Sequence, residues 1–347
     1  MKNINRREFI IKGSTITLGT GIMLKTGFGF PVPPPMSRVV EVFHPGAVIQ
    51  DREVDADIVR SMLRSGLTDL TGVDSHPLSE FINPDDVVGL KINCLGRPLI
   101  YTHKELIEAF IQELKEIGVK ENNIIVWDRF EQHMTGCGFV MNDTSTGVRY
   151  MATERKGADK SLFDPEYVYR SDADNSFKRN EDGNESRFSS LFTSTCDKII
   201  NMAILKDHAL AGVTLCLKNV AYGICNNNGR FHGPQHIGNF IADVYALPEV
   251  REKFVLNIID GLEGCYDNGP LPSKEKDLFT PKKIWLSSDP VALDVAGLEV
   301  IEAKRIEMGY NTVTESRPGT NHIELAAATG VGNCKPDEIN NVKVDMG

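Results

Sequence analysis

The residues best suited to chemistry in this sequence follow short apolar runs, where strands of a sheet would end. They are Lys91, Asn93, Lys206, Asp207, His208, Asp260 and Ser288. Because the carboxyl ends of parallel strands meet at one edge of a sheet, we expect these side chains to line one cleft. Lysine would hold an anionic group there. Histidine, which titrates near neutral pH, would act as a general acid or base.

A second polar stretch, residues 218–236, adds to this cleft. It contains four asparagines and three glycines, which allow left-handed backbone and close approach to a ligand. The predicted catalytic residues are Lys206, His208, His232 and Lys218. The predicted ligand-binding residues are Lys91, Asn93, Asn219, Arg230 and Ser288.

A divalent metal is the cofactor that the acidic residues of this region could hold. Asp207, Asp260 and Asp294 would offer it hard oxygen ligands. Asp294 falls on the apolar stripe of a predicted helix, so it pairs either with a cation in the cleft or with backbone amides of a neighbouring loop. His232 and His236 are four residues apart, but Gly233 and Pro234 separate them, which favours a turn over a metal site.

The elements that must position these residues alternate along the chain. Apolar runs predict strands at 39–43, 87–94, 124–127, 199–205, 255–259 and 284–286. Helical spacing predicts helices at 54–70, 104–117, 290–306 and 321–329, with Asp289 as an N-cap before Pro290. The pattern indicates an α/β fold: a mainly parallel, mixed sheet with helices on both faces, in one large domain or two lobes.

One segment departs from this alternation. Residues 158–190 are polar, and the core of the segment, 171–185, has almost no apolar residue. We interpret it as a long loop or insertion in a domain that spans residues 36–347.

The first 35 residues resemble an export signal of the twin-arginine type. Arg6 and Arg7 precede Phe9, and a weakly apolar run, 13–30, ends in a group of prolines. Lys25 interrupts this run, which is too short for a spanning helix of about 20 apolar residues. We therefore expect a removable signal, the translocation machinery as a partner, a periplasmic or otherwise extracytoplasmic location, and no stable membrane span after processing.

Composition narrows the classes of ligand and cofactor. The whole chain has a formal charge of −10, and the predicted signal contributes five basic residues and one acidic residue, so the remainder carries about −14. Such a surface argues against sequence-independent binding of nucleic acid. The seven cysteines include no C-x-x-C pair, so an iron–sulfur cluster is not expected, and most of them are interpreted as small core residues.

Several of these motifs together resemble the DUF362 family. The matching segments are Val88-Gly-Leu-Lys-Ile-Asn93, Asn201-Met-Ala-Ile-Leu-Lys-Asp-His208, Gly212-Val-Thr-Leu-Cys-Leu-Lys-Asn219, Asp260-Gly-Leu-Glu-Gly264, Ser287-Ser-Asp-Pro-Val-Ala-Leu-Asp294 and His322-Ile-Glu-Leu-Ala326. The family name denotes a domain of unknown function, so the resemblance implies a shared site without naming its reaction. The second motif usually reads Leu-Lys-Thr-His, and Asp207 here replaces the threonine. Some members carry a cysteine-rich ferredoxin-like segment, which this sequence lacks.

Three hypotheses follow from the sequence. The first is an enzyme that acts on a small anionic or polyhydroxy molecule, with metal assistance as an option. The second is a non-catalytic protein that binds a metal or an organic cofactor, since folded export is often used when a cofactor is inserted beforehand. The third is a structural or partner-binding protein, which no amphipathic surface or coiled-coil pattern supports.

Overall fold

The computed structural model describes residues 2–4, 36–157, 161–171, 183–317 and 321–347. The predicted export signal at 1–35 lies outside the described residues, apart from the short strand β1 (Lys2–Ile4). None of the described helices is both long and apolar enough to cross a membrane.

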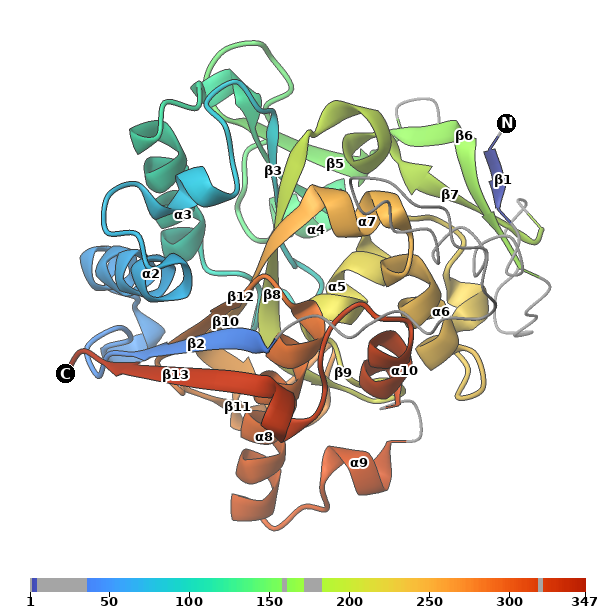
Figure 1. Cartoon of the computed structure of the whole chain (residues 1–347). Helices are drawn as coiled ribbons and strands as arrows, with labels where there is room; N and C mark the ends of the chain where they lie inside the picture. Colours follow the sequence, from blue (N-terminus) through green and yellow to red (C-terminus); the bar gives the residue numbers. More distant parts are fainter. Residues whose placement is uncertain (1, 5–35, 158–160, 172–182, 318–320) are drawn as a thin grey trace, which may run out of the picture.

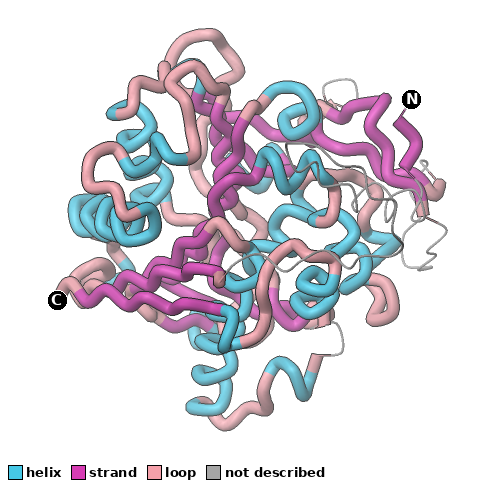
Figure 2. Tube along the Cα trace, in the orientation of Figure 1, coloured by secondary structure: helices cyan, strands magenta, loops and turns pink. Residues whose placement is uncertain are grey.

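The centre of the molecule is a mixed ten-stranded sheet (Figures 1 and 2). Its main strands run in the order β13-β2-β12-β10-β8-β3-β4-β5, while β9 pairs with β8 and β11 pairs with β10. Their bounds are β2 (Ser37–Phe43), β3 (Val88–Lys91), β4 (Ile124–Phe130), β5 (Arg149–Glu154), β8 (Lys198–His208), β9 (Gly212–Val213), β10 (Phe254–Cys265), β11 (Leu278–Phe279), β12 (Lys283–Ser287) and β13 (Ile339–Asp345). The α/β fold predicted from the alternating pattern is therefore confirmed.

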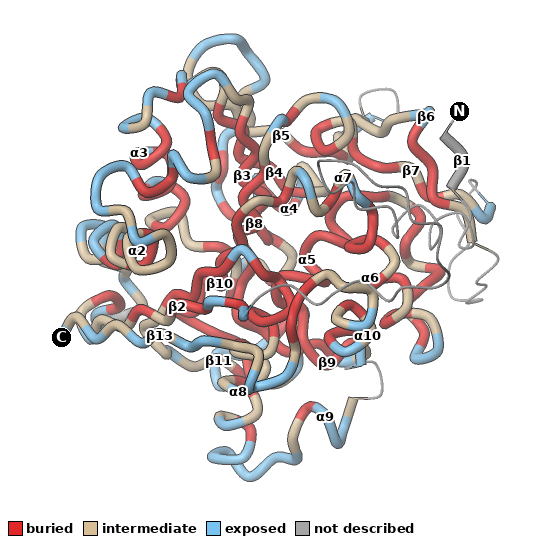
Figure 3. The backbone as a smooth tube through the Cα atoms, viewed as in Figure 1, coloured by how far each residue is buried: buried red, intermediate tan, exposed pale blue. Residues whose placement is uncertain are grey.

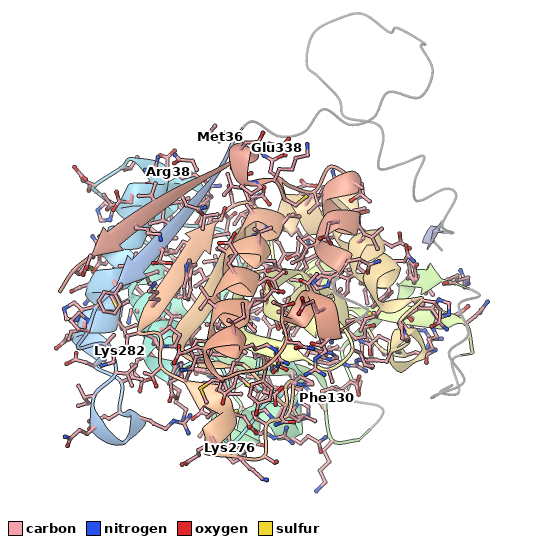
Figure 4. All side chains as sticks on the ribbon, turned by 90° about the horizontal axis from the view of Figure 1, so that it is seen from below. Met36, Arg38, Phe130, Lys276, Lys282 and Glu338 are labelled. Carbon is pink, nitrogen blue, oxygen red and sulfur yellow. The ribbon has the colours of Figure 1, made fainter. Side chains whose placement is uncertain are left out.

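One strand of the main path runs against the others. β12 pairs antiparallel with both β10 and β2, whereas β10, β8, β3, β4 and β5 pair parallel in succession. The carboxyl ends of the parallel strands form one edge of the sheet, and β12 begins at that edge. Figure 4 shows the two edges at opposite ends of the ribbon, with Met36 and Glu338 at one end and Phe130, which closes β4, at the other.

Helices cover both faces of the sheet (Figure 1). On one face, α2 (Ala56–Thr71) and α3 (Lys104–Glu116) pack on apolar side chains such as Val88, Leu90 and Ile200. On the other face, α5 (Leu215–Gly223), α6 (Ile237–Tyr245) and α8 (Pro290–Glu307) pack on Trp127, Ala203 and Ile259. The remaining helices are α4 (Glu131–Gly136), α7 (Pro248–Lys253), α9 (Val313–Ser316), α10 (His322–Ala328) and several single turns.

Local sequence explains the helix boundaries. Asp289 begins α8, where its carboxylate accepts hydrogen bonds from the N–H groups of Val291 and Ala292, as predicted for an N-cap before Pro290. Asp55 caps α2 in the same way, and Gly72 ends that helix in a left-handed conformation with φ of 75°.

Two strands of the polar segment 158–190 border its core, 171–185. β6 (Phe163–Arg170) pairs antiparallel with β7 (Glu185–Ser189), and β1 pairs parallel with β6. Tyr167, Val168 and Tyr169 are buried against Phe188 and its neighbours, and this burial stabilises strands that the polar composition concealed. Residues 172–182, the centre of the predicted loop, lie outside the described residues.

The core extends through β8 and the whole of α5 (Figure 3). All nine residues of α5 are buried, including Lys218 and Asn219. Six of the seven cysteines are also buried, in agreement with their interpretation as small core residues.

Candidate functional site

The direction in which the chain adds strands reverses between β3 and β8. From β3 the chain proceeds outward to β4 and β5, whereas from β8 it proceeds to β10 on the opposite side. α3, which follows β3, covers one face, and α5, which follows β8, covers the other. In α/β sheets, ligands bind beyond the carboxyl ends of the two strands at such a reversal. We call this region of the molecule the crevice. Lys91 ends β3 there, and His208 ends β8.

Lys91 is neutralised within the crevice. Its Nζ donates to Asp128 Oδ1 at 2.8 Å and to the Ile92 carbonyl at 2.6 Å. Burial alone would raise the pKa of Asp128, but the Lys91 ammonium and two backbone N–H donors hold it below its usual value. A Cβ on Gly223 would lie 2.5 Å from Lys91 Cε, so this glycine of α5 leaves the space that Lys91 fills.

A chain of asparagines joins the strands to α5. Asn93 Oδ1 accepts from Lys206 Nζ at 2.7 Å, and Asn93 Nδ2 donates to Asn219 Oδ1 at 2.9 Å. Asn219 Nδ2 in turn donates to Asn201 Oδ1 at 2.8 Å. These asparagine hydrogen bonds fix the position of the Lys206 side chain, but amide groups place no negative charge beside its ammonium group.

His208 is held in one tautomer by the tight turn between β8 and β9. Its Nδ1 accepts from the N–H groups of Leu210 and Ala211, each at 3.1 Å. The proton of the neutral ring must therefore lie on Nε2. Burial, and then the charge of Lys218, lowers the pKa of His208 well below its usual value.

Lys218 lies against aromatic rings. Its Nζ is 4.0 Å from the centroid of the Tyr222 ring, which lies one turn further along α5. The Tyr222 and His232 rings meet edge to face at 4.4 Å, and the His208 and His232 rings are stacked at 6.2 Å. Lys206, His208, Lys218 and His232 form what we call the Lys–His cluster.

The cluster has cations but no anion among the described residues. Lys206 and Lys218 are 0% and 4% exposed, and no carboxylate of the described chain forms an ion pair with either. Burial lowers the pKa of Lys206 to about 8 and the pKa of Lys218 to about 7, and the charge of Lys206 lowers the latter further. Burial also lowers the pKa of His232 to about 3. Desolvated cations of this kind favour an anionic ligand.

A surface pocket lies at the carboxyl side of the sheet, and no residue of the Lys–His cluster lines it. Its volume is about 610 Å³, and it is lined by Leu95, Arg97, Pro98, His133, Gly136 and Leu271. Burial lowers the pKa of His133 to about 4, and the charges that act on this ring include those of Asp128 and Lys206. The pocket therefore lies within electrostatic range of the crevice.

Two predicted ligand-binding residues lie elsewhere. Arg230 is buried, and its guanidinium donates to the Ser171 carbonyl and to Ser186 Oγ beside the β6–β7 sheet. Ser288 follows β12, and because β12 is antiparallel, Ser288 lies at the opposite edge of the sheet from Lys206. The expectation that all the strand ends share one rim was therefore wrong for β12.

The three aspartates proposed as metal ligands are separated from one another. Asp207 accepts from the Gly269 N–H, Asp260 binds His103, and Asp294 accepts from the N–H groups of Cys216 and Leu217 at the start of α5. The backbone alternative for Asp294 is thus the one observed, and burial raises its pKa to about 8.

Neither the aspartates nor the histidine pair builds a metal centre in the described part of the chain. Across those residues, no group of three or more His, Cys, Asp or Glu side chains is arranged to hold a metal ion. His232 ends a single turn of helix, and His236 immediately precedes α6. Elemental analysis of the native protein would test whether it carries a metal.

The structure also brings in residues outside the predicted catalytic, ligand-binding and metal-binding sets. Asp128, Tyr222 and Asn201 complete the ion pair, the aromatic wall and the asparagine chain. Asn201 is a polar residue within the apolar run 199–205, and Asp128 directly follows the apolar run 124–127, so the sequence carries a signal for both. Tyr222 had no such signal, because its role depends on the helical turn that separates it from Lys218.

Comparison with known proteins gives a family but no activity. A family model described as "Domain of unknown function (DUF362)" matches residues 88–299. The matched segment contains the whole Lys–His cluster, together with Lys91, Asn93 and Asp128. A search of curated proteins found no match.

Proposed function

The chain belongs to the DUF362 family, and we propose from the geometry of its Lys–His cluster that it is an enzyme whose substrate is a small molecule with a phosphate or carboxylate group. The Lys–His cluster would hold that group in the crevice between β3 and β8. The observation that carries this proposal is the burial of Lys206 and Lys218 without a carboxylate partner in the described chain.

Free energy supports a ligand in this position. An ammonium group buried without a partner costs several kcal/mol of effective desolvation, at an order-of-magnitude level. A phosphate or carboxylate between Lys206 and Lys218 would supply the missing opposite charge. Lys206 and Lys218 therefore lower the stability of the protein without a ligand. A bound anion in the cluster would offset that cost, which explains why two such lysines are present.

The histidines would supply acid–base chemistry to that ligand. The neutral His208 ring carries its proton on Nε2 and can donate a hydrogen bond to the bound anion, since Nδ1 is occupied by two backbone N–H groups. A bound anion would raise the pKa of His232 from its lowered value towards neutrality, which leaves His232 as the acid–base group. Proton transfer would thus be possible with the ligand bound and suppressed without it.

Calorimetry with inorganic phosphate tests the proposal. The wild-type protein should bind phosphate, and the double variant Lys206→Met, Lys218→Met should lose at least about tenfold in affinity, the equivalent of 1.4 kcal/mol. Lys120→Met removes an exposed lysine of the same chain and is the matched control. Equal affinity in the wild type and a folded double variant would refute the proposal.

We also propose that the protein is exported through the twin-arginine route. The order Arg6, Arg7, Phe9, apolar run and prolines supports this. The test is fractionation of cells that express the wild type or the Arg6→Lys, Arg7→Lys variant. Retention of the variant alone in the cytoplasm would support export, and identical fractionation of both would contradict it.

A further inference from the structure

The three lysines of the crevice differ in what holds their protons. Lys91 Nζ donates to a carboxylate and a carbonyl, and Lys206 Nζ donates to the Asn93 amide oxygen at 2.7 Å. Lys218 Nζ has no hydrogen-bond acceptor among the described residues. It makes a cation–π contact with the face of the Tyr222 ring. Of the three, Lys218 is therefore the easiest to deprotonate.

The groups around Lys218 also disfavour its charge. From β8 it is faced by Lys206 and His208, and from the turn before α6 by His232. The charge of Arg129, at the end of β4, acts on His232, and that of His322, from α10, acts on His208. These neighbours are cationic or neutral.

Two buried acids of this region are engaged elsewhere. Asp128 is paired with Lys91, and Asp294 is bound to backbone N–H groups at the start of α5. Burial lowers the pKa of Lys218 to about 7, so about half of the amine is free at neutral pH. An ordinary lysine has about a thousandth of that free fraction.

A free amine in such surroundings is a nucleophile. Enzymes activate lysine in this way, by desolvation and by a second cation nearby. His232 is only partly buried, and its ring contacts Tyr222, so the cluster reaches solvent on this side. Lys206 remains fixed by Asn93 beside the amine, where it can hold the anionic end of a ligand.

We propose that Lys218 forms an imine with a small carbonyl compound that carries a carboxylate or phosphate group. The nitrogen lone pair attacks the carbonyl carbon, and one proton moves from the nitrogen to the carbonyl oxygen to give a neutral carbinolamine. As the C–O bond breaks, His232 or solvent donates the second proton of the departing water, and the nitrogen then returns its remaining proton to that group, which leaves the C=N bond. One amine and one carbonyl thus give one imine and one water, with no oxidant or reductant.

This proposal rests on the proposed function, because the anion site is what brings the carbonyl compound to the amine. It adds the substrate class and separates the roles of the lysines. Lys206 positions the anionic group, whereas Lys218 bonds to the reacting carbon.

Reductive trapping tests the assignment. The full-length protein is treated with dihydroxyacetone phosphate or pyruvate and sodium cyanoborohydride, and modified lysines are located by peptide mass spectrometry. Lys218 should be labelled at least about tenfold faster than the exposed Lys120, with a midpoint near pH 7 where an ordinary lysine would respond near pH 10.5. Unphosphorylated dihydroxyacetone should label it more slowly.

Variants keep the test decisive. Lys218→Arg retains the positive charge and should show no label at position 218, and Lys218→Met repeats the test should the arginine disturb folding. Lys206→Met should slow labelling by the phosphate compound much more than labelling by dihydroxyacetone. Wild-type protein that binds phosphate but is not labelled at Lys218 overturns the imine proposal and leaves the anion site intact. Protein that neither binds phosphate nor is labelled overturns both.

Discussion

Two groups of charged side chains lie at the carboxyl side of the sheet, and they are built in opposite ways. One consists of Arg52, His103, Asp260 and Glu263, and we call it the paired cluster. Arg52 binds Glu263 through two nitrogens, and His103 binds Asp260 through Nδ1 and Glu263 through Nε2. The other is the Lys–His cluster, in which the two lysines have no carboxylate among the described residues.

The pKa values reflect this difference. Burial alone would lower the pKa of His103, but the charge of Asp260 and its hydrogen bond, followed by Glu263, raise it to about 10. In the Lys–His cluster, burial lowers the pKa of every titratable member. Buried side chains of opposite charge that pair with one another connect the strands and loops that carry them. Buried charged side chains without such a pair indicate that a ligand supplies the opposite charge.

Removing one partner from the paired cluster should have the largest effect on stability. His103→Leu leaves Asp260 buried without its cation, and we expect a loss of about 3–5 kcal/mol in the free energy of unfolding. Denaturant unfolding measures this loss, and phosphate affinity in the folded variant should stay close to that of the wild type. A loss below about 1 kcal/mol, the range of solvent-exposed ion pairs, would contradict a stabilising role for the paired cluster.

Removing a charged side chain from the Lys–His cluster should change the free energy of unfolding in the opposite direction. Lys218→Met removes a buried ammonium that has no counter-ion in the described chain, so stability should rise by about 1–3 kcal/mol. The measurement is again denaturant unfolding, with Lys120→Met as the matched control, for which little change is expected. Destabilisation by Lys218→Met would show that the lysine has a structural partner and would remove the contrast between the two clusters.

A smaller effect should appear in the pH dependence of stability. Lys218 has a pKa of about 7 when folded and the ordinary value of 10.5 when unfolded, so the unfolded chain binds more protons between these values. Its contribution therefore makes stability rise with pH across this window. His103, with a raised folded pKa, contributes stability at low pH that is lost between pH 6.5 and about 10.

Because Lys218 and His103 change stability with pH in opposite directions, their effects partly cancel in the wild type. The difference in free energy of unfolding between the wild type and each variant separates them. The free energy of unfolding of the wild type relative to Lys218→Met should rise from pH 7 to pH 10. The wild type relative to His103→Leu should fall over the same range. Parallel curves for all three proteins would contradict both pKa assignments.

Anion affinity should itself depend on pH, by a modest factor. Sulfate keeps its charge between pH 6 and 9, so a change in its affinity reports on the protein. Since Lys218 and Lys206 lose protons near pH 7 and pH 8, affinity for sulfate should fall as pH rises through this range. Calorimetry in buffers of different ionisation enthalpy should show proton uptake on binding at pH 7.5. Affinity that is flat from pH 6 to pH 9 would count against the cluster as the site.

The sequence predicted the presence of the central strands and their mainly parallel arrangement, but it misplaced several strand ends and the direction of β12. Compact apolar runs identified β8 and β10, and the sheet then brought Lys91, Asn93 and Lys206 together as expected. The direction of β12 could not be predicted, because a short buried run has the same pattern whether its neighbours are parallel or antiparallel. That uncertainty is what misplaced Ser288.

Elements without a clear period were also missed. α5 is buried on all sides, so its sequence has no polar face to indicate a helix, and the spacing of Lys218 and Tyr222 by one turn could not be inferred. β6 and β7 are flanked by polar residues, and only the packing of Tyr167 in β6 against Phe188 in β7 and against Phe192 shows why they are strands. Long-range burial, which one sequence does not display, decided these cases.

The most direct measurement is a crystal structure of the protein grown with selenate, whose anomalous signal marks its position. The account predicts a selenate ion in the crevice between β3 and β8, within hydrogen-bond distance of Lys206 Nζ and Lys218 Nζ. A well-ordered crevice in which both lysines bind a carboxylate of the chain, with selenate elsewhere, would contradict it.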